Sequence, residues 1–284
     1  MLLLGYGYVA RRLAARLIAG GWRVAGTYRD PSRIEAIEAD GVEPVAWDAG
    51  GLAPGAFDNV SSVLISAPPG DDGCPALVAA GEALAETRER MRWIGYLSTN
   101  GVYGDRNGGW VDEDSALRTT SPRGKNRIAA EEGWRRLARE AGAPLAIFRL
   151  PGIYGPRRSA LDAVREGRAQ RVLKQGQVFS RAHVDDIAAA LQSSLQNPSA
   201  GALFNIADDE PAPPQDVIAY ACGLLGATPP PLVPIAEAGL SEMAASFYAD
   251  NKRVSNRLMK ERLLPRLAYP TYREGLRALF DAGY

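Results

Sequence analysis

The chain has 284 residues, 46% of them hydrophobic, which is enough to bury the core of one large domain or of a domain with a smaller lobe. Its 33 Lys and Arg residues balance 33 Asp and Glu residues, so no net charge attracts nucleic acid or a membrane surface. A single histidine excludes a His-rich metal site, and we expect no metal centre. Two distant cysteines without a pairing pattern, and no long apolar segment at the start, favour a cytoplasmic location.

The first half of the chain alternates short apolar runs with helical patterns, which is typical of a parallel sheet covered by helices. The apolar runs predict buried strands over residues 1–4, 23–28, 43–46, 62–66, 93–98 and 145–150. Helical patterns occupy residues 9–19 and 121–140, and the second begins with a capping Ser121 and Pro122. Beyond Gly155 the pattern loosens into proline-rich segments, which favours a smaller C-terminal lobe.

The first predicted strand, the glycines after it and the first predicted helix are typical of dinucleotide binding. Gly5 allows the tight turn, Gly7 lets a pyrophosphate approach the backbone, and a small residue at Ala10 lets the helix pack close to the strand. The helix N-terminus, at Tyr8, then faces the phosphates. A purely structural turn is the alternative for such a short motif.

The end of the second predicted strand favours NADP over NAD. NAD sites usually place an acid there to bind the ribose hydroxyls, but this chain has Thr27 followed by Tyr28 and Arg29. Arg29, with Arg33, could bind a 2′-phosphate through charge-assisted hydrogen bonds. The alternative is that Arg29 is a solvated loop residue, and NAD stays open as the cofactor.

Two later strand ends complete the predicted cofactor pocket. Trp47 and Asp48 follow the third predicted strand and are expected to approach the adenine. Ala67 and Pro68 follow the fourth and are expected to form the pocket floor.

Four further motifs follow in order: YLSTNGVYGD, RGKNRIAAEE, FRLPGIYGP and RAHVDDIAAAL. With the N-terminal glycines they resemble the extended short-chain dehydrogenase/reductase family of nucleotide-sugar epimerases and dehydratases, over nearly the whole chain. The resemblance implies an α/β fold, a doubly wound Rossmann sheet with a smaller C-terminal substrate lobe. It implies a dinucleotide-binding domain over residues 1–152, to which residues 179–206 return, and a substrate lobe over residues 153–178 and 207–284.

The resemblance also assigns expected roles to single residues. Thr99 matches the family's catalytic Ser/Thr, and Pro151 and Ile153 match the stretch beside the nicotinamide. His183 and Asp186 match a segment that returns to the core, where a lone histidine is more often a hydrogen-bonded core residue than a base.

Two arginines replace the Tyr-x-x-x-Lys pair of the family. Arg123 stands where the tyrosine is usual and Arg127 where the lysine is usual. Arginine stays protonated and cannot act as a general base, but it can bind a phosphate or a carboxylate. We therefore expect an altered active site in which Thr99, Arg123 and Arg127 contact an anion.

A second departure points the same way. Dehydratase relatives carry an Asp-Glu pair after the threonine, whereas this chain has Asn100 and Gly101. The nearby Tyr103 and Tyr154 could replace the lost proton donor, or they could be framework aromatics.

The sequence leaves two functions open. One is an NADP-dependent, epimerase-like oxidoreductase that acts on a small anionic or nucleotide-linked substrate. The other is a non-catalytic NAD(P)-binding sensor or scaffold. With either function, a homodimer is possible. We expect neither nucleic acid nor a membrane as partner.

Overall fold

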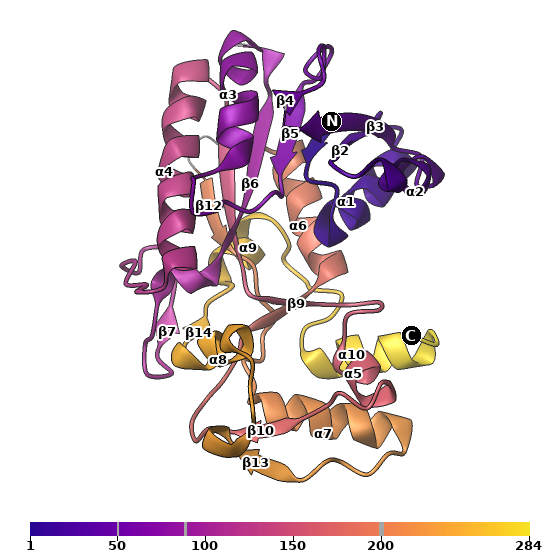
Figure 1. The fold of residues 1–284 in the computed structure, drawn as a ribbon, viewed down its shortest axis with the longest axis vertical. Coiled ribbons are helices and arrows are strands. Elements are labelled where there is room, and N and C mark those ends of the chain that lie inside the picture. Colours follow the sequence, from indigo (N-terminus) through magenta and orange to yellow (C-terminus); the bar gives the residue numbers. More distant parts are fainter. Residues whose placement is uncertain (50, 88–89, 199–201) are drawn as a thin grey trace. The chain divides into compact units, whose positions relative to one another are not determined.

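The computed structural model describes residues 1–49, 51–87, 90–198 and 202–284, and these divide into two compact units (Figure 1). The first unit comprises Met1–Val102, Thr120–Arg149 and Ile187–Phe204. The second comprises Tyr103–Thr119, Leu150–Asp186 and Asn205–Tyr284.

A predominantly parallel sheet forms the centre of the first unit, which confirms the predicted Rossmann-like α/β fold. Its eight described strands lie in the order β12-β8-β6-β5-β1-β2-β3-β4, and β4 at the edge pairs antiparallel with β3. The strands are β1 (Leu2–Leu4), β2 (Ala25–Tyr28), β3 (Glu43–Asp48), β4 (Gly51–Leu52), β5 (Ser62–Ile65), β6 (Trp93–Thr99), β8 (Leu145–Leu150) and β12 (Ala202–Asn205).

Helices cover both faces of this sheet. Figure 1 shows α3 and α4 on one side and α1 and α6 on the other. Two side-chain hydrogen bonds connect α6 to its neighbours. Arg16 of α1 donates to Gln192, and Trp93 of β6 donates to Ser194. The helices are α1 (Tyr8–Ala19), α2 (Ile34–Ala39), α3 (Pro75–Thr87), α4 (Pro122–Ala141) and α6 (Val184–Gln196), with short 3-10 turns η1 (Pro31–Arg33) and η3 (Asn100–Tyr103).

The strand order reverses at β1, which fixes where a ligand can bind. The chain moves from β1 outward to β2 and β3, and then returns to place β5 on the other side of β1. The loops that leave β1 and β5 therefore diverge, and in open α/β sheets such a switch point opens a crevice at the carboxyl ends of the strands.

The second unit combines short strand pairs with helices. Its parallel pairs are β7 with β14, β9 with β11 and β10 with β13. A separate apolar core joins α5, α7 and α10 around Leu161, Ala221 and Leu276. The elements are β7 (Trp110–Val111), β9 (Gly152–Tyr154), α5 (Ala160–Arg165), β10 (Arg171–Leu173), β11 (Arg181–His183), α7 (Pro214–Leu225), β13 (Leu232–Pro234), η4 (Ile235–Glu237), α8 (Glu242–Ala249), β14 (Arg253–Val254), α9 (Arg257–Arg262) and α10 (Tyr272–Asp281).

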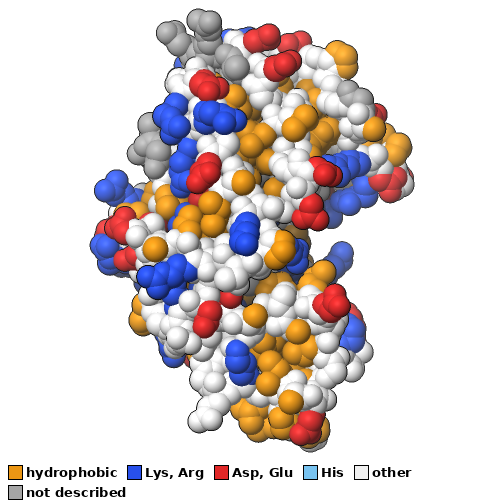
Figure 2. Space-filling view, turned by 60° about the vertical axis from the view of Figure 1, so that its left-hand side comes forward, with side chains coloured by type: hydrophobic (Ala, Val, Ile, Leu, Met, Phe, Trp, Pro, Cys, Tyr) orange, Lys and Arg blue, Asp and Glu red, His pale blue; other side chains and the backbone are white. Residues whose placement is uncertain are grey.

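Positively and negatively charged side chains are interspersed on the face drawn in Figure 2. No helix of the described residues has the length and apolar character needed to cross a membrane. Both cysteines, Cys74 and Cys222, are buried and free. A cytoplasmic location stays a prediction.

A buried ion pair ties α4 to the sheet in the first unit. Glu131 of α4 is fully buried and accepts hydrogen bonds from Arg149 of β8 at 3.0 and 2.8 Å. The same carboxylate accepts from the hydroxyl of Ser98, in β6, at 2.6 Å and from Arg135 at 3.3 Å. One carboxylate therefore fixes α4 against the end of β6, where Thr99 follows.

We predict that Arg149→Met lowers the free energy of unfolding by about 3–5 kcal/mol, because it leaves the Glu131 charge buried without its main partner. Arg136→Met is the matched control, since Arg136 is exposed and its nearest carboxylate, on Glu140, is 4.0 Å away. Its removal should change the free energy by less than about 1 kcal/mol. Urea unfolding measures both, and equal losses would contradict the assigned role of the buried pair.

Candidate functional site

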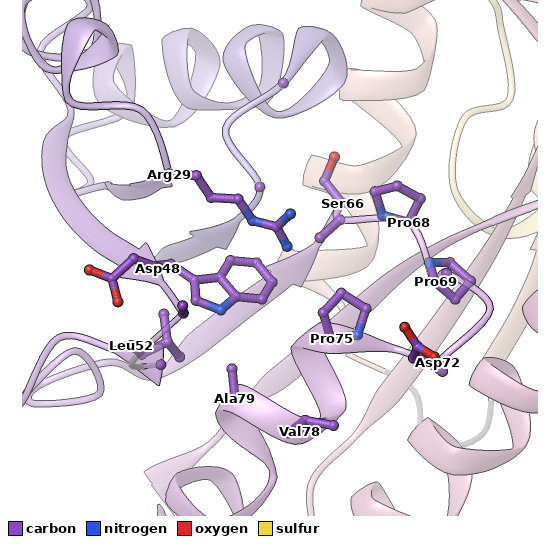
Figure 3. A pocket seen from close by; sticks show the side chains of 18 of the residues that line it. Arg29, Asp48, Leu52, Ser66, Pro68, Pro69, Asp72, Pro75, Val78 and Ala79 are labelled. Atoms are coloured by element: carbon purple, nitrogen blue, oxygen red, sulfur yellow. The ribbon is translucent and has the colours of Figure 1, made fainter.

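A pocket of about 1480 Å³ opens at the strand ends of the first unit (Figure 3). It lies at the switch point, between the loop after β1 and the loop after β5. The structure brings into it the predicted cofactor residues Gly5, Gly7, Arg29, Asp48, Ala67 and Pro68. These residues come from four different strand ends, so the pocket has the position that the sequence predicted for the dinucleotide.

The two glycines of the first loop have different physical roles. Gly5 has a φ of +93°, and a Cβ there would lie 2.8 Å from the backbone nitrogen of Ala67, so only glycine fits. Gly7 has an ordinary φ of −105°, and a Cβ there would meet nothing within 4 Å. Gly5 is therefore required by the fold, whereas the space beside Gly7 is open to a ligand at the N-terminus of α1.

Other predicted residues hold this loop without lining the pocket. The Thr27 hydroxyl accepts a hydrogen bond from the Gly5 backbone nitrogen at 2.8 Å. Ala10 is fully buried on the sheet side of α1, and Tyr8 begins that helix. These residues position the glycine turn, so a direct contact of Thr27 or Ala10 with cofactor stays a prediction.

The end of β2 is followed by a cation, Arg29, and then by an acid, Asp30. Arg29 lines the pocket, and its guanidinium carbon lies 5.1 Å from the ring centre of Trp47. The Asp30 carboxylate accepts a hydrogen bond from the backbone nitrogen of Ser32 at 3.0 Å and so caps η1. Arg33 is exposed at the end of η1 and does not line the pocket.

Sequence reasoning missed the opposite wall of the pocket. Pro75, Val78 and Ala79 of α3 line it, and Val78 is 83% exposed although it is apolar. Asp72 lies at the turn before α3. The signal was present in the GDDG turn, residues 70–73, whose two end glycines hydrogen-bond each other and aim the start of α3 at the pocket.

The α4 cations lie outside the residues that line this pocket. Arg127 donates from Nη1 to the Leu97 carbonyl at 2.6 Å and to the Tyr96 hydroxyl at 3.3 Å. One partner of its positive charge is therefore a backbone carbonyl near the end of β6. Arg123 is exposed, and no described residue hydrogen-bonds its side chain. An acid does reach this helix, because Asp71 accepts from Asn126 at 3.1 Å.

Thr99 ends β6, and its hydroxyl accepts a hydrogen bond from the Gly101 backbone nitrogen at 3.1 Å. The hydroxyl therefore supports the turn η3, and its catalytic role stays a prediction. Tyr96, which accepts a hydrogen bond from Arg127, is poorly suited to act as the proton donor in place of the family's tyrosine. Burial raises the pKa of Tyr96 to about 12, although Arg127 opposes the shift.

The two tyrosines considered as replacement proton donors are framework residues of the second unit. Tyr103 is fully buried and donates to Asn205 at 2.8 Å. Tyr154 donates to the Thr271 carbonyl at 3.3 Å, and burial raises its pKa far above the ordinary value. Pro151 and Ile153 also belong to this unit, at β9, so their contact with a nicotinamide stays a prediction.

His183 and Asp186 have structural contacts in the second unit. Asp186 accepts from the backbone nitrogens of Ala268 and Tyr269 at 2.8 and 3.0 Å. His183 is 1% exposed, and its Nδ1 accepts from the Asp185 backbone nitrogen at 3.2 Å. These contacts are structural, but they lie in the second unit, whereas the sequence assigned residues 179–206 to the dinucleotide-binding domain.

A buried carboxyl next to this segment was not predicted. Asp208 is 3% exposed, and one of its oxygens accepts a weak 3.3 Å hydrogen bond from the Glu210 backbone nitrogen. Burial raises the pKa of Asp208 to about 8, although Arg181 opposes the shift. Among the described residues, no cluster of His, Cys, Asp and Glu side chains could hold a metal ion.

Comparison with known proteins gives a family match. Residues 80–207 match the model of the NAD dependent epimerase/dehydratase family. A functionally unknown conserved protein from Silicibacter pomeroyi, of solved structure, is 48% identical, with a TM-score of 0.93 over 99% of this chain and 98% of its own. Protein YeeZ of Escherichia coli is 27% identical over 281 residues, which cover 90% of this chain and 93% of YeeZ.

More distant structures share the fold. UDP-glucuronic acid 4-epimerase from Bacillus cereus, in complex with UDP-glucuronic acid and NAD, is 17% identical, with a TM-score of 0.78 over 99% of this chain and 98% of its own. The dTDP-glucose 4,6-dehydratase from Bacillus anthracis, in complex with NAD, is also 17% identical, with a TM-score of 0.78 over 99% and 94%.

The buried Asp208 predicts a pH-dependent stability. Its folded-state pKa of about 8 lies above the unfolded value of about 3.9, so the folded state holds a proton that the unfolded state has released. Stability should therefore fall as pH rises from about 4 to 8, with a slope of at most about 1.4 kcal/mol per pH unit from this group.

We predict that Asp208→Asn removes this loss, so the stability gained over the parent grows between pH 5 and 8 and then levels off. Asp209→Asn is the control, because Asp209 is partly exposed and pairs with Lys260 at 2.9 Å. Urea unfolding at several pH values measures the difference. Parallel curves for the parent and Asp208→Asn would show that the carboxyl is not buried in its neutral form.

Proposed function

We propose that this chain is a member of the NAD-dependent epimerase/dehydratase family, whose model matches residues 80–207, and that it binds NADP in the pocket of its first unit and acts as an oxidoreductase of altered active site. The observation that carries the proposal is the open space beside Gly7 at the N-terminus of α1. Backbone N–H groups and the helix dipole favour a pyrophosphate there. The pocket around it has room for a dinucleotide and mixes apolar walls with few charges.

The choice of NADP over NAD rests on the positions of Arg29, which lines the pocket, and of Asp30, which does not. A 2′-phosphate needs a cation at the end of β2, and Arg29 lines the pocket there. An NAD site usually has an acid at the end of this strand for the ribose hydroxyls, but Asp30 caps η1 and is not among the residues that line the pocket. The solved relatives in complex with NAD keep NAD as the other outcome of a titration.

The proposed reaction is hydride transfer between the nicotinamide and a small anionic or nucleotide-linked substrate. The cofactor supplies or accepts the hydride, and the chain supplies binding and orientation. Thr99 would hydrogen-bond the substrate, and Arg123 would bind its anionic group, since no described residue hydrogen-bonds that guanidinium. Arg127 fixes the end of β6 through the Leu97 carbonyl and adds positive charge beside it.

One observation favours a non-catalytic NAD(P)-binding sensor as a second candidate. Tyr103 and Tyr154, which lie within the motifs YLSTNGVYGD and FRLPGIYGP, are both buried and hydrogen-bonded. Neither is therefore exposed as a proton donor. Turnover of any substrate from a panel of anionic sugars and nucleotide sugars would favour the enzyme. A dinucleotide bound to the purified protein, without turnover over that panel, would favour the sensor.

We predict that the protein binds NADPH more tightly than NADH, and that Arg29→Ala removes about 1.5–3 kcal/mol of the preference, the range of hydrogen bonds to charged groups. Calorimetric titration of both nucleotides measures it. Gly7→Val should weaken both nucleotides, because its side chain fills the open space while the fold is retained. Equal affinity for both nucleotides in the parent would exclude the NADP preference, and unchanged binding by Gly7→Val would make the glycine loop only a turn.

The α4 arginines make a separate prediction. Phosphate should stabilise the protein by about 2.7 kcal/mol at a hundredfold excess over its dissociation constant. The stabilisation should disappear in Arg123→Ala/Arg127→Ala and persist in Lys125→Ala, which removes an exposed neighbouring charge from the same helix. Thermal unfolding with and without phosphate measures it. Persistence in the double variant would mean that the anion binds elsewhere and that these arginines bind no substrate.

A further inference from the structure

The strand register places Arg29 beside Trp47. Strands β2 and β3 pair in parallel with Tyr28 opposite Ala46, so Arg29, the first residue after β2, comes level with Trp47 of β3. The Arg29 guanidinium carbon lies over the Trp47 ring, 5.1 Å from its centre, and both residues line the pocket, in which Figure 3 labels Arg29.

Trp47 is a rigid support for this contact. Its side chain is only 5% exposed and belongs to the apolar core of the first unit. Across the sheet edge, Leu52 of β4 pairs with it in register and packs against that core. An indole fixed in this way limits the positions of a long, exposed arginine that otherwise has many rotamers.

The contact is a cation–π interaction, in which the ring attracts the positive charge without a hydrogen-bond acceptor of the protein. A carboxylate or phosphate is instead bound by the N–H groups of a guanidinium. No described residue forms a hydrogen bond or ion pair with Arg29, and Figure 3 shows the Asp48 carboxylate turned away from it. All five N–H donors therefore remain available to a ligand.

We propose that Trp47 is a positioning residue that holds Arg29 ready for the phosphate monoester of a 2′-phosphorylated adenine nucleotide. The inference rests on the proposed function, because it names the residue that makes the same pocket selective. An arginine without the indole would have to be ordered by the ligand itself, and the affinity for the phosphorylated nucleotide would fall accordingly.

The test compares Trp47→Leu with Trp47→Phe, using 2′,5′-ADP, 5′-AMP, NADPH and NADH as probes in calorimetric titrations. Trp47→Leu keeps an apolar side chain but removes the aromatic face, so the preference for the 2′-phosphorylated member of each pair should fall about fivefold. Trp47→Phe should retain most of the preference. Trp22→Leu is the matched control, because Trp22 is partly exposed and does not line the pocket.

A double-mutant cycle separates positioning from general loss of structure. Arg29→Lys keeps the charge but loses the planar group that stacks. If Trp47 acts through Arg29, adding Trp47→Leu to Arg29→Lys should lower the preference no further. Thermal unfolding identifies variants that have lost the fold, in which case the Trp47→Phe and Arg29→Lys variants decide.

The outcomes are distinct. A fivefold loss in Trp47→Leu that is absent from the Arg29→Lys background supports the inference. An unchanged preference in Trp47→Leu, or equal losses in both backgrounds, overturns it. A parent protein that binds neither dinucleotide overturns the proposed function itself, whatever the variants do.

Discussion

The buried carboxylate of Glu131 is the contact on which the arrangement of the first unit depends. It accepts hydrogen bonds from Ser98 of β6 and Arg149 of β8 while it belongs to α4, so it joins one helix to two adjacent strands of the central sheet. A charge without exposure to water requires such partners, because an unpaired buried carboxylate is strongly unfavourable. The pairing therefore sets where α4 presents its arginines relative to the end of β6.

This constraint explains how α4 carries positive charge near its N-terminus, where the helix dipole disfavours cations. Groups of the protein compensate part of this charge. The Leu97 carbonyl and the Tyr96 hydroxyl accept hydrogen bonds from Arg127, and the Asp71 carboxylate accepts one from Asn126 of the same helix. Arg123, like Lys125, is exposed, and no described residue hydrogen-bonds its side chain. The two arginines, four residues apart on one helix, thus have different surroundings: the protein binds the side chain of Arg127 and leaves that of Arg123 open to solvent.

The pocket at the switch point shows the same division between structural and ligand-directed residues. Backbone geometry requires Gly5, and Thr27 accepts a hydrogen bond from its backbone nitrogen. In contrast, the space beside Gly7 is empty, and the N–H groups of Arg29 have no described acceptor. Groups that the fold fixes in place, but that have no hydrogen-bond partner within the protein, can bind a ligand at low entropic cost. In dinucleotide-binding Rossmann folds the ligand lies in a crevice at this place, and the charge at the end of the second strand distinguishes NAD from NADP.

The sequence by itself determined the alternating α/β pattern, the strands within two residues at each end, and the pocket residues that follow strand ends, because buried parallel strands are continuous apolar runs and their ends lie at one edge of a sheet. It did not find β4, which has only two residues, or β12, which lies beyond Gly155 where the sequence pattern loosens. It also could not show that Arg127 binds a backbone carbonyl, that Asp208 is buried, or that Trp47 supports Arg29. Those facts depend on which side chains meet after distant segments pack, and only the tertiary structure decides that.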